Sequence, residues 1–198
     1  MRMILAITMA LALASPASAQ EETLIDGDIE YGWFFAPIAK LSVLDGDLAF
    51  LGGARGGLII NHNLNIGGGI FSLDSKNISR QVTGPDEIKR MTLTYGGLMG
   101  EYDFNPLRLT HVSVVMLLGY GEANYEFKGP DYQYIDDALA DGLFVFEPEI
   151  DFTVNLTTFA HVGAGAGYRF VSGVERHGLS NGDIAGPSIS AIVRFGNF

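Results

Sequence analysis

Hydrophobicity alternates from residue to residue over eight stretches of this chain. In residues 142–156, "GLFVFEPEIDFTVNL", large apolar side chains fall on even positions, whereas Glu147, Glu149 and Asp151 fall on odd positions. Because a β-strand turns successive side chains to opposite faces, each stretch predicts a strand with one apolar face. The eight stretches are residues 31–43, 48–60, 64–73, 91–104, 112–122, 142–156, 160–170 and 188–195.

The connections between these stretches alternate in length. Short turns follow the second, fourth and sixth stretches, and long connections occupy about 74–90, 126–141 and 172–183. Only "LDGD" after the first stretch breaks this asymmetry. Ten-residue alternating segments with short turns at one end and long loops at the other are typical of transmembrane β-barrels. The pattern predicts an all-β fold: an eight-stranded antiparallel up-and-down barrel in the bacterial outer membrane.

The fourth stretch, 91–104, changes phase. Met91 and Tyr95 lie on one parity, whereas Tyr102 and Phe104 lie on the other. Glycines at 96, 97 and 100 could hold a β-bulge, in which one extra residue resets the parity. We therefore expect a bulge in this strand.

The first 30 residues predict export. Arg2, the apolar run that follows it and the Ala17-Ser18-Ala19 sequence form a secretory signal peptide over residues 1–19. An acidic, mobile lead covers residues 20–30, and the barrel covers residues 31–198. The apolar run is too short for a transmembrane helix, which needs about 20 residues.

Composition restricts the class of protein further. The chain contains 26 glycines, 13 phenylalanines and 8 tyrosines, a mixture that favours strands over helices. It has no cysteine, so neither a disulfide nor a thiolate metal site is possible. Removal of the signal peptide leaves 11 basic and 23 acidic residues, a net charge of −12. A chain this acidic is not expected to bind nucleic acid.

The polar faces distinguish a barrel in lipid from a barrel in water. Residues 160–170 place Gly163, Gly165 and Gly167 on the polar parity. Glycine weakens a strand, and a water-facing surface gains nothing from it. An eight-stranded barrel has an interior just wide enough for side chains, so small residues there make room for large ones. The glycines therefore predict that the polar face lines a narrow lumen and the apolar face contacts lipid.

Three longer segments carry a resemblance to a known family. Residues 31–71, residues 144–174 and the ending "VRFGNF" resemble small bacterial outer-membrane β-barrel proteins of unassigned function. More loosely, the chain is similar to the barrels typified by the OmpA membrane domain and OmpX. The resemblance implies contact with outer-membrane lipid and lipopolysaccharide. It also implies that the barrel-assembly machinery reads the terminal Phe198, although Phe195 has the opposite parity.

Charged residues of the lumen parity predict a buried ion-pair network. A buried carboxylate is costly unless it is paired, and arginine can pair with it through two hydrogen bonds. Antiparallel pairing across a turn at residues 155–158 would place Glu147 opposite Gly167 and Glu149 opposite Gly165. Mid-strand Arg55 is then the expected partner of the glutamates. The predicted network comprises Lys40, Arg55, Glu147, Glu149, Asp151, Arg169 and Arg194.

Other polar clusters give weaker indications of a function. A glycosidase with Glu147 and Glu149 would lack room for a sugar ring. His111 and Ser113 resemble the His-x-Ser of lipid A deacylases, but they lie at the short-turn end and are expected at the polar rim. The remaining candidates lie in long loops: His177, Ser180 and Asp183 for an enzyme, and Asp131, Asp136, Asp137 and Asp141 for a divalent cation. We assign no catalytic, cofactor-binding or metal-binding residue.

The sequence therefore predicts a monomeric barrel with a structural or surface-interaction role and a lumen plugged by charges. Two alternatives remain open. One is a lipid A-modifying hydrolase or acyltransferase at the outer rim, and the other is a porin-like pore for small solutes.

Overall fold

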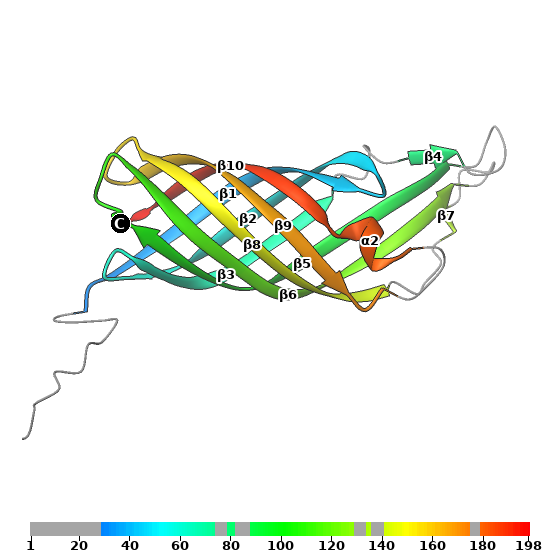
Figure 1. Cartoon of the computed structure of the whole chain (residues 1–198), viewed down its shortest axis with the longest axis horizontal. Coiled ribbons are helices and arrows are strands. Elements are labelled where there is room, and N and C mark those ends of the chain that lie inside the picture. Colours follow the sequence, from blue (N-terminus) through cyan, green and yellow to red (C-terminus); the bar gives the residue numbers. More distant parts are fainter. Residues whose placement is uncertain (1–28, 74–78, 82–87, 129–133, 136–140, 175–178) are drawn as a thin grey trace, which may run out of the picture.

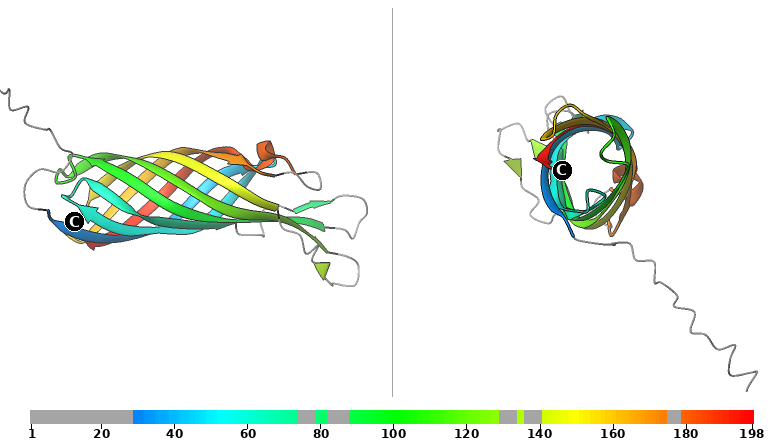
Figure 2. Two further views of the ribbon diagram at one scale, coloured as in Figure 1. Left: turned by 90° about the horizontal axis from the view of Figure 1, so that it is seen from below. Right: turned by 90° about the vertical axis from the view of Figure 1, so that its left-hand side faces the viewer.

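A computed structural model describes residues 29–73, 79–81, 88–128, 134–135, 141–174 and 179–198 of the chain. Eight long antiparallel strands form a closed barrel (Figure 1), which the view along its axis shows as a ring (Figure 2). Pairing of β5 with β6 closes the sheet order β5-β3-β2-β1-β10-β9-β8-β6. The strands are β1 (Tyr31–Leu44), β2 (Asp47–Ile60), β3 (Leu64–Leu73), β5 (Ile88–Phe104), β6 (Thr110–Lys128), β8 (Asp141–Asn155), β9 (Ala160–Ser172) and β10 (Gly186–Asn197). The predicted fold class is confirmed.

Three small elements lie within the predicted long loops. β4 (Ser79–Gln81) pairs with β5, and β7 (Tyr134–Ile135) pairs with β6. The short helix α2 (Asn181–Ile184) lies between β9 and β10. All three gather at one end of the barrel (Figure 1), where β5 and β6 extend beyond their neighbours. We take this as the outer end, because long loops face outward in barrels of this kind.

The opposite end carries the short turns, which connect β2 to β3, β5 to β6 and β8 to β9. β1 begins and β10 ends there (Figure 1). This end faces the periplasm by the same rule. The predicted signal peptide and most of the acidic lead lie outside the described residues and stay predictions.

The barrel has its apolar surface outside. Large hydrophobic side chains around its circumference are exposed, and most of them sit on the parity expected for the lipid face. Among them are Trp33, Phe35, Leu58, Ile70, Leu98, Leu118, Tyr120, Phe144, Ile150, Phe152, Phe170 and Ile189. Within the described part of the chain, no helix is long and apolar enough to cross a membrane.

The predicted bulge in the fourth stretch is wrong. β5 pairs with β6 in one unbroken register from Ile88 opposite Lys128 to Phe104 opposite Val112. Met91 and Tyr95 therefore share the lumen face with Glu101. The change of polarity along one face produced the error, because this face is apolar near the outer end and charged nearer the periplasm.

Buried apolar side chains are concentrated at the outer end of the lumen. Leucine, valine, methionine and alanine side chains from the outer ends of several strands fill it, together with three side chains from the connection that carries α2. They are Leu44, Ala49, Leu51, Leu73, Met91, Leu93, Ala123, Leu143, Val145, Val174, Leu179 and Ile184. These described side chains belong to the larger cluster of buried hydrophobic residues that continues along the lumen.

Candidate functional site

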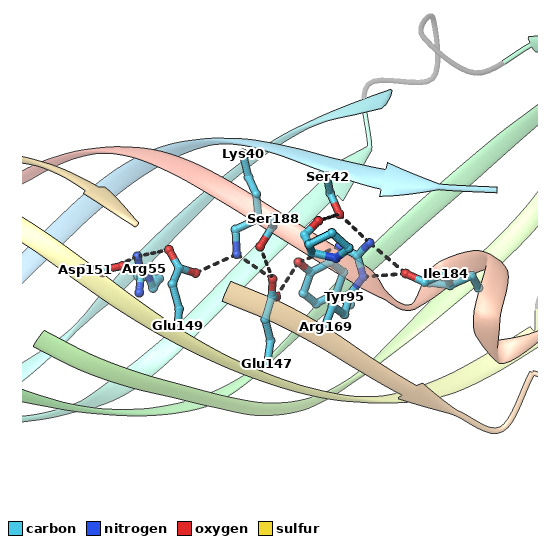
Figure 3. A network of polar contacts seen from close by, with 11 residues as sticks. Lys40, Ser42, Arg55, Tyr95, Glu147, Glu149, Asp151, Arg169, Ile184 and Ser188 are labelled. Carbon is cyan, nitrogen blue, oxygen red and sulfur yellow. Dashed lines mark hydrogen bonds and ion pairs between the residues drawn. The ribbon is translucent and has the colours of Figure 1, made fainter. Parts of the chain in front are cut away.

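The centre of the lumen holds a ladder of ion pairs. Lys40 Nζ lies 2.9 Å from Glu147 Oε1 and 3.1 Å from Glu149 Oε2. Arg55 Nη2 lies 3.0 Å from Asp151 Oδ2 and 3.4 Å from Glu149 Oε1. All five side chains are buried. Figure 3 shows that the ladder follows the barrel axis, with Asp151 and Arg55 at one end.

Strand geometry positions these groups. Glu147, Glu149 and Asp151 are successive lumen-facing residues of β8, because only every second residue points inward. A Cβ atom at Gly165 of β9 would collide with the carboxylates of Glu149 and Asp151. The glycines of β9 therefore leave the space that the acidic side chains occupy.

Arg169 links this ladder to the outer end. Its Nε and Nη2 atoms donate hydrogen bonds of 3.0 and 2.9 Å to the carbonyl oxygen of Ile184 in α2. Nη2 also donates to Ser42 Oγ at 3.1 Å, and Nη1 lies 3.5 Å from the hydroxyl of Tyr95. That hydroxyl donates to Glu147 Oε2 at 2.7 Å. Arg169 has no exposed surface. Through these contacts the polar network runs without a break from α2 to Asp151 (Figure 3).

A second cluster lies nearer the periplasm. Arg194 Nη1 donates to Glu101 Oε1 at 2.6 Å and lies 3.6 Å from Asp103 Oδ2. Asp103 also accepts hydrogen bonds from Asn65 and Ser113. Sequence reasoning missed Glu101 and Asp103, although their inward parity in an unbroken β5 would have revealed them.

The partners of the predicted network differ in part from those expected. Glu147 pairs with Lys40 and not with Arg55. The strand register also differs by two residues, because Glu149 lies opposite Gly167 and Asp151 lies opposite Gly165. β8 continues through Asn155, which pairs with His161, so the turn begins one residue later than predicted. A register shift of two residues preserves which face of the strand points inward. It changes only the depth along the barrel at which each charge lies.

The periplasmic mouth of the lumen is a pocket of about 380 Å³. His111 and His161 line it, with ring centroids 6.2 Å apart. The ring of Phe198 stacks on His161 at 3.7 Å, so the terminal aromatic side chain lies at this mouth. His111 is buried on the lumen face, and Ser113 beside it donates to Asp103. The His-x-Ser pair thus forms part of the polar interior at the periplasmic end.

The outer-rim candidates form a helix cap. Ser180 Oγ donates to Asp183 Oδ2 at 2.8 Å, and the backbone nitrogen of Ser180 donates to the same oxygen at 2.7 Å. This is a capping box, which satisfies backbone groups at the start of a helix. His177, Asp131, Asp136 and Asp137 lie outside the described residues, as does the side chain of Asp141. Within the described residues, no three His, Asp or Glu side chains could together hold a metal ion.

These features define the class of protein. A barrel with an apolar exterior and charges in its interior requires lipid outside it, because water-soluble barrels have the reverse arrangement. Each of the eight described barrel strands is paired on both sides, so none of them presents an open edge to the hydrocarbon. The chain is an outer-membrane β-barrel protein of the small eight-stranded type.

Solved structures share this fold. Neisserial surface protein A matches with a TM-score of 0.61 and 13% identity, over 87% of this chain and 100% of that one. The N-terminal β-barrel domain of OprF from Pseudomonas aeruginosa matches with a TM-score of 0.55 and 12% identity, over 85% and 99%. No protein-family model matches the sequence, and a search of curated proteins gave no significant match. The likeness concerns the architecture, which these outer-membrane proteins share with this chain.

Proposed function

We propose that this protein is a non-conducting barrel that anchors a surface-interaction platform in the outer membrane. The observation that carries the proposal is that the described side chains fill the lumen. Two different barriers lie in series along it: the ion-pair network in the centre and the apolar core at the outer end. An ion or solute would have to break buried salt bridges and then cross a dry layer, each at a cost of several kcal/mol.

The outer end supplies the proposed platform. β5 and β6 project beyond the barrel rim, and β4 and β7 widen that projection into a short sheet (Figure 1). The segment with α2 is attached to the rim by Arg169 and by a 2.7 Å hydrogen bond from Asp45 N to Asp183 O. A rigid anchor that holds projecting segments outside the membrane suits a surface-interaction role. We propose a monomer that contacts outer-membrane lipid and lipopolysaccharide and is inserted by the barrel-assembly machinery.

Planar-bilayer recording tests whether the lumen is closed. We expect the refolded protein to insert without measurable single-channel conductance. As a matched test of the barrier, Leu51→Ser together with Leu93→Ser should hydrate the apolar core without touching an ion pair. Stable conductance steps from the unmodified protein would contradict the proposal.

A lipid A-modifying enzyme is the second candidate, and the pairing of Ser180 with Asp183 argues against it. If these residues only cap α2, Ser180→Ala should leave lipid A unchanged and lower stability by about 1 kcal/mol, the usual effect of losing a helix cap. Mass spectrometry of lipid A from cells with no protein, wild-type protein and the variant checks this. A lipid A modification that needs both the protein and Ser180 would instead establish the enzyme.

A further inference from the structure

The described charges inside the lumen do not balance. Each is buried, and among them the carboxylates outnumber the cations by one. A net charge held away from water is strongly disfavoured unless a counter-ion or a proton neutralises it. The carboxylates are Glu101, Asp103, Glu147, Glu149 and Asp151, and the cations are Lys40, Arg55, Arg169 and Arg194.

One pair of carboxylates has the geometry to hold the missing positive charge. Asp151 accepts the Arg55 hydrogen bond on Oδ2, whereas its buried Oδ1 has no partner. Glu149 Oε1 and Asp151 Oδ1 converge on the same space above Gly165, where a Cβ atom would touch both. Two carboxylates that share a site cannot both ionise readily, and such a pair commonly keeps one proton.

We propose that Glu149 and Asp151 share one bound proton, held between Asp151 Oδ1 and Glu149 Oε1. The proton comes from water, and no other bond is made or broken. As a hydroxyl, Asp151 Oδ1 donates a hydrogen bond to Glu149 and is no longer an unpaired buried oxygen. Asp151 Oδ2 still accepts from Arg55, and Glu149 Oε2 still accepts from Lys40. The described charges of the lumen then balance, and its observed hydrogen bonds remain intact.

The surroundings favour this pair over the other candidates. Asp103 already accepts from Ser113 and Asn65, and Glu147 accepts from Tyr95 and Lys40. Protonating the mouth histidines would place positive charges beside each other and beside Arg194. The charged groups that face the proposed pair are Arg55 from β2, Lys40 from β1, Glu101 from β5 and Arg194 from β10.

Two cavities lie on the periplasmic side of the pair. A small cavity of about 10 Å³ lies against Asp151, Arg55 and Arg194, enough for about one water molecule. Arg194 also lines the pocket at the periplasmic mouth. The apolar cluster of the outer end lies on the other side of the pair. Loss of the proton at alkaline pH should therefore destabilise the barrel in response to periplasmic pH.

Asp151→Asn tests the proposal, because its amide imitates a protonated carboxyl group. The melting temperature of the refolded protein, followed by gel shift, should fall from mildly acidic to alkaline pH for the wild type. It should change little for Asp151→Asn, which should melt several degrees above the wild type at alkaline pH. Infrared difference spectra should show the carbonyl band of a protonated carboxyl group at neutral pH in the wild type and not in the variant.

Glu101→Gln is the matched control, since it neutralises another buried lumen carboxylate. It should keep the alkaline loss of stability and the infrared band. If Glu101→Gln removes the alkaline loss of stability and the infrared band while Asp151→Asn keeps them, the proton sits at Glu101 and Asp103. The proposal then fails. A melting temperature that depends on sodium or potassium concentration, with no infrared band, would assign the charge to a bound cation and would also overturn it. A failure here leaves the closed lumen of the proposed function intact, because conductance tests that separately.

Discussion

Replacing Arg55 with alanine should lower the free energy of unfolding by about 3–5 kcal/mol, the typical effect of removing one partner from a buried ion pair. Arg55 is the only described cation within salt-bridge distance of Asp151, and it also pairs with Glu149. Without it, Asp151 loses its cation and Glu149 keeps only Lys40. Urea titration in lipid vesicles, or the gel-shift melting temperature, measures the loss.

Two further variants separate the ion pair from the volume of the side chain. Arg55→Met keeps most of the bulk and should be nearly as unstable as Arg55→Ala. Adding Asp151→Asn to Arg55→Met should recover part of the loss, because it removes one of the two acidic groups that lose Arg55. If Arg55→Ala and the wild type melt at the same temperature, Arg55 does not stabilise the lumen.

Replacing Leu118 with arginine should destabilise the inserted barrel by about 2–4 kcal/mol, the effect of a cationic side chain near the middle of the membrane. Leu118 is 52% exposed and lies between Leu98 of β5 and Phe146 of β8. Its neighbours are all apolar, so the guanidinium would face hydrocarbon. Unfolding in lipid vesicles gives the difference from the wild type.

Leu109→Arg is the matched control. Leu109 is 71% exposed in the short turn between β5 and β6, outside the membrane-spanning strands. We expect a change within about 0.5 kcal/mol, as for most surface substitutions. Equal effects at both positions would contradict the assignment of the β6 exterior to the lipid phase.

The alternation of hydrophobicity was enough to predict the fold. Its period of two residues identified eight strands, and the glycines on the polar face of residues 160–170 indicated which face was inward. β5 is the exception, because its inward face begins with Met91 and Leu93 and ends with Glu101 and Asp103. Parity is a local property, whereas the polarity of a lumen position depends on its depth along the barrel.

The pairing of charges was less accessible to sequence reasoning. All seven residues predicted to face the lumen are buried there. Of the two glutamates, however, Arg55 pairs only with Glu149, and it pairs with Asp151 as well, whereas Lys40 pairs with Glu147. Which charges are partners across a barrel depends on the stagger between its strands. A one-residue error in the start of the turn after Asn155 shifted the predicted register of β8 against β9 by two residues.

The sequence by itself determined which side chains face lipid and which face inward, because a strand has only two faces and the membrane requires the outer one to be apolar. Tertiary structure alone decided the depth of each inward residue. That depth placed Glu149 and Asp151 together over Gly165, tied Arg169 to α2 and collected an apolar core at the outer end. The physical reason is that these contacts join residues far apart in the chain, whose relative heights are set by the closure of the whole barrel and not by any one strand.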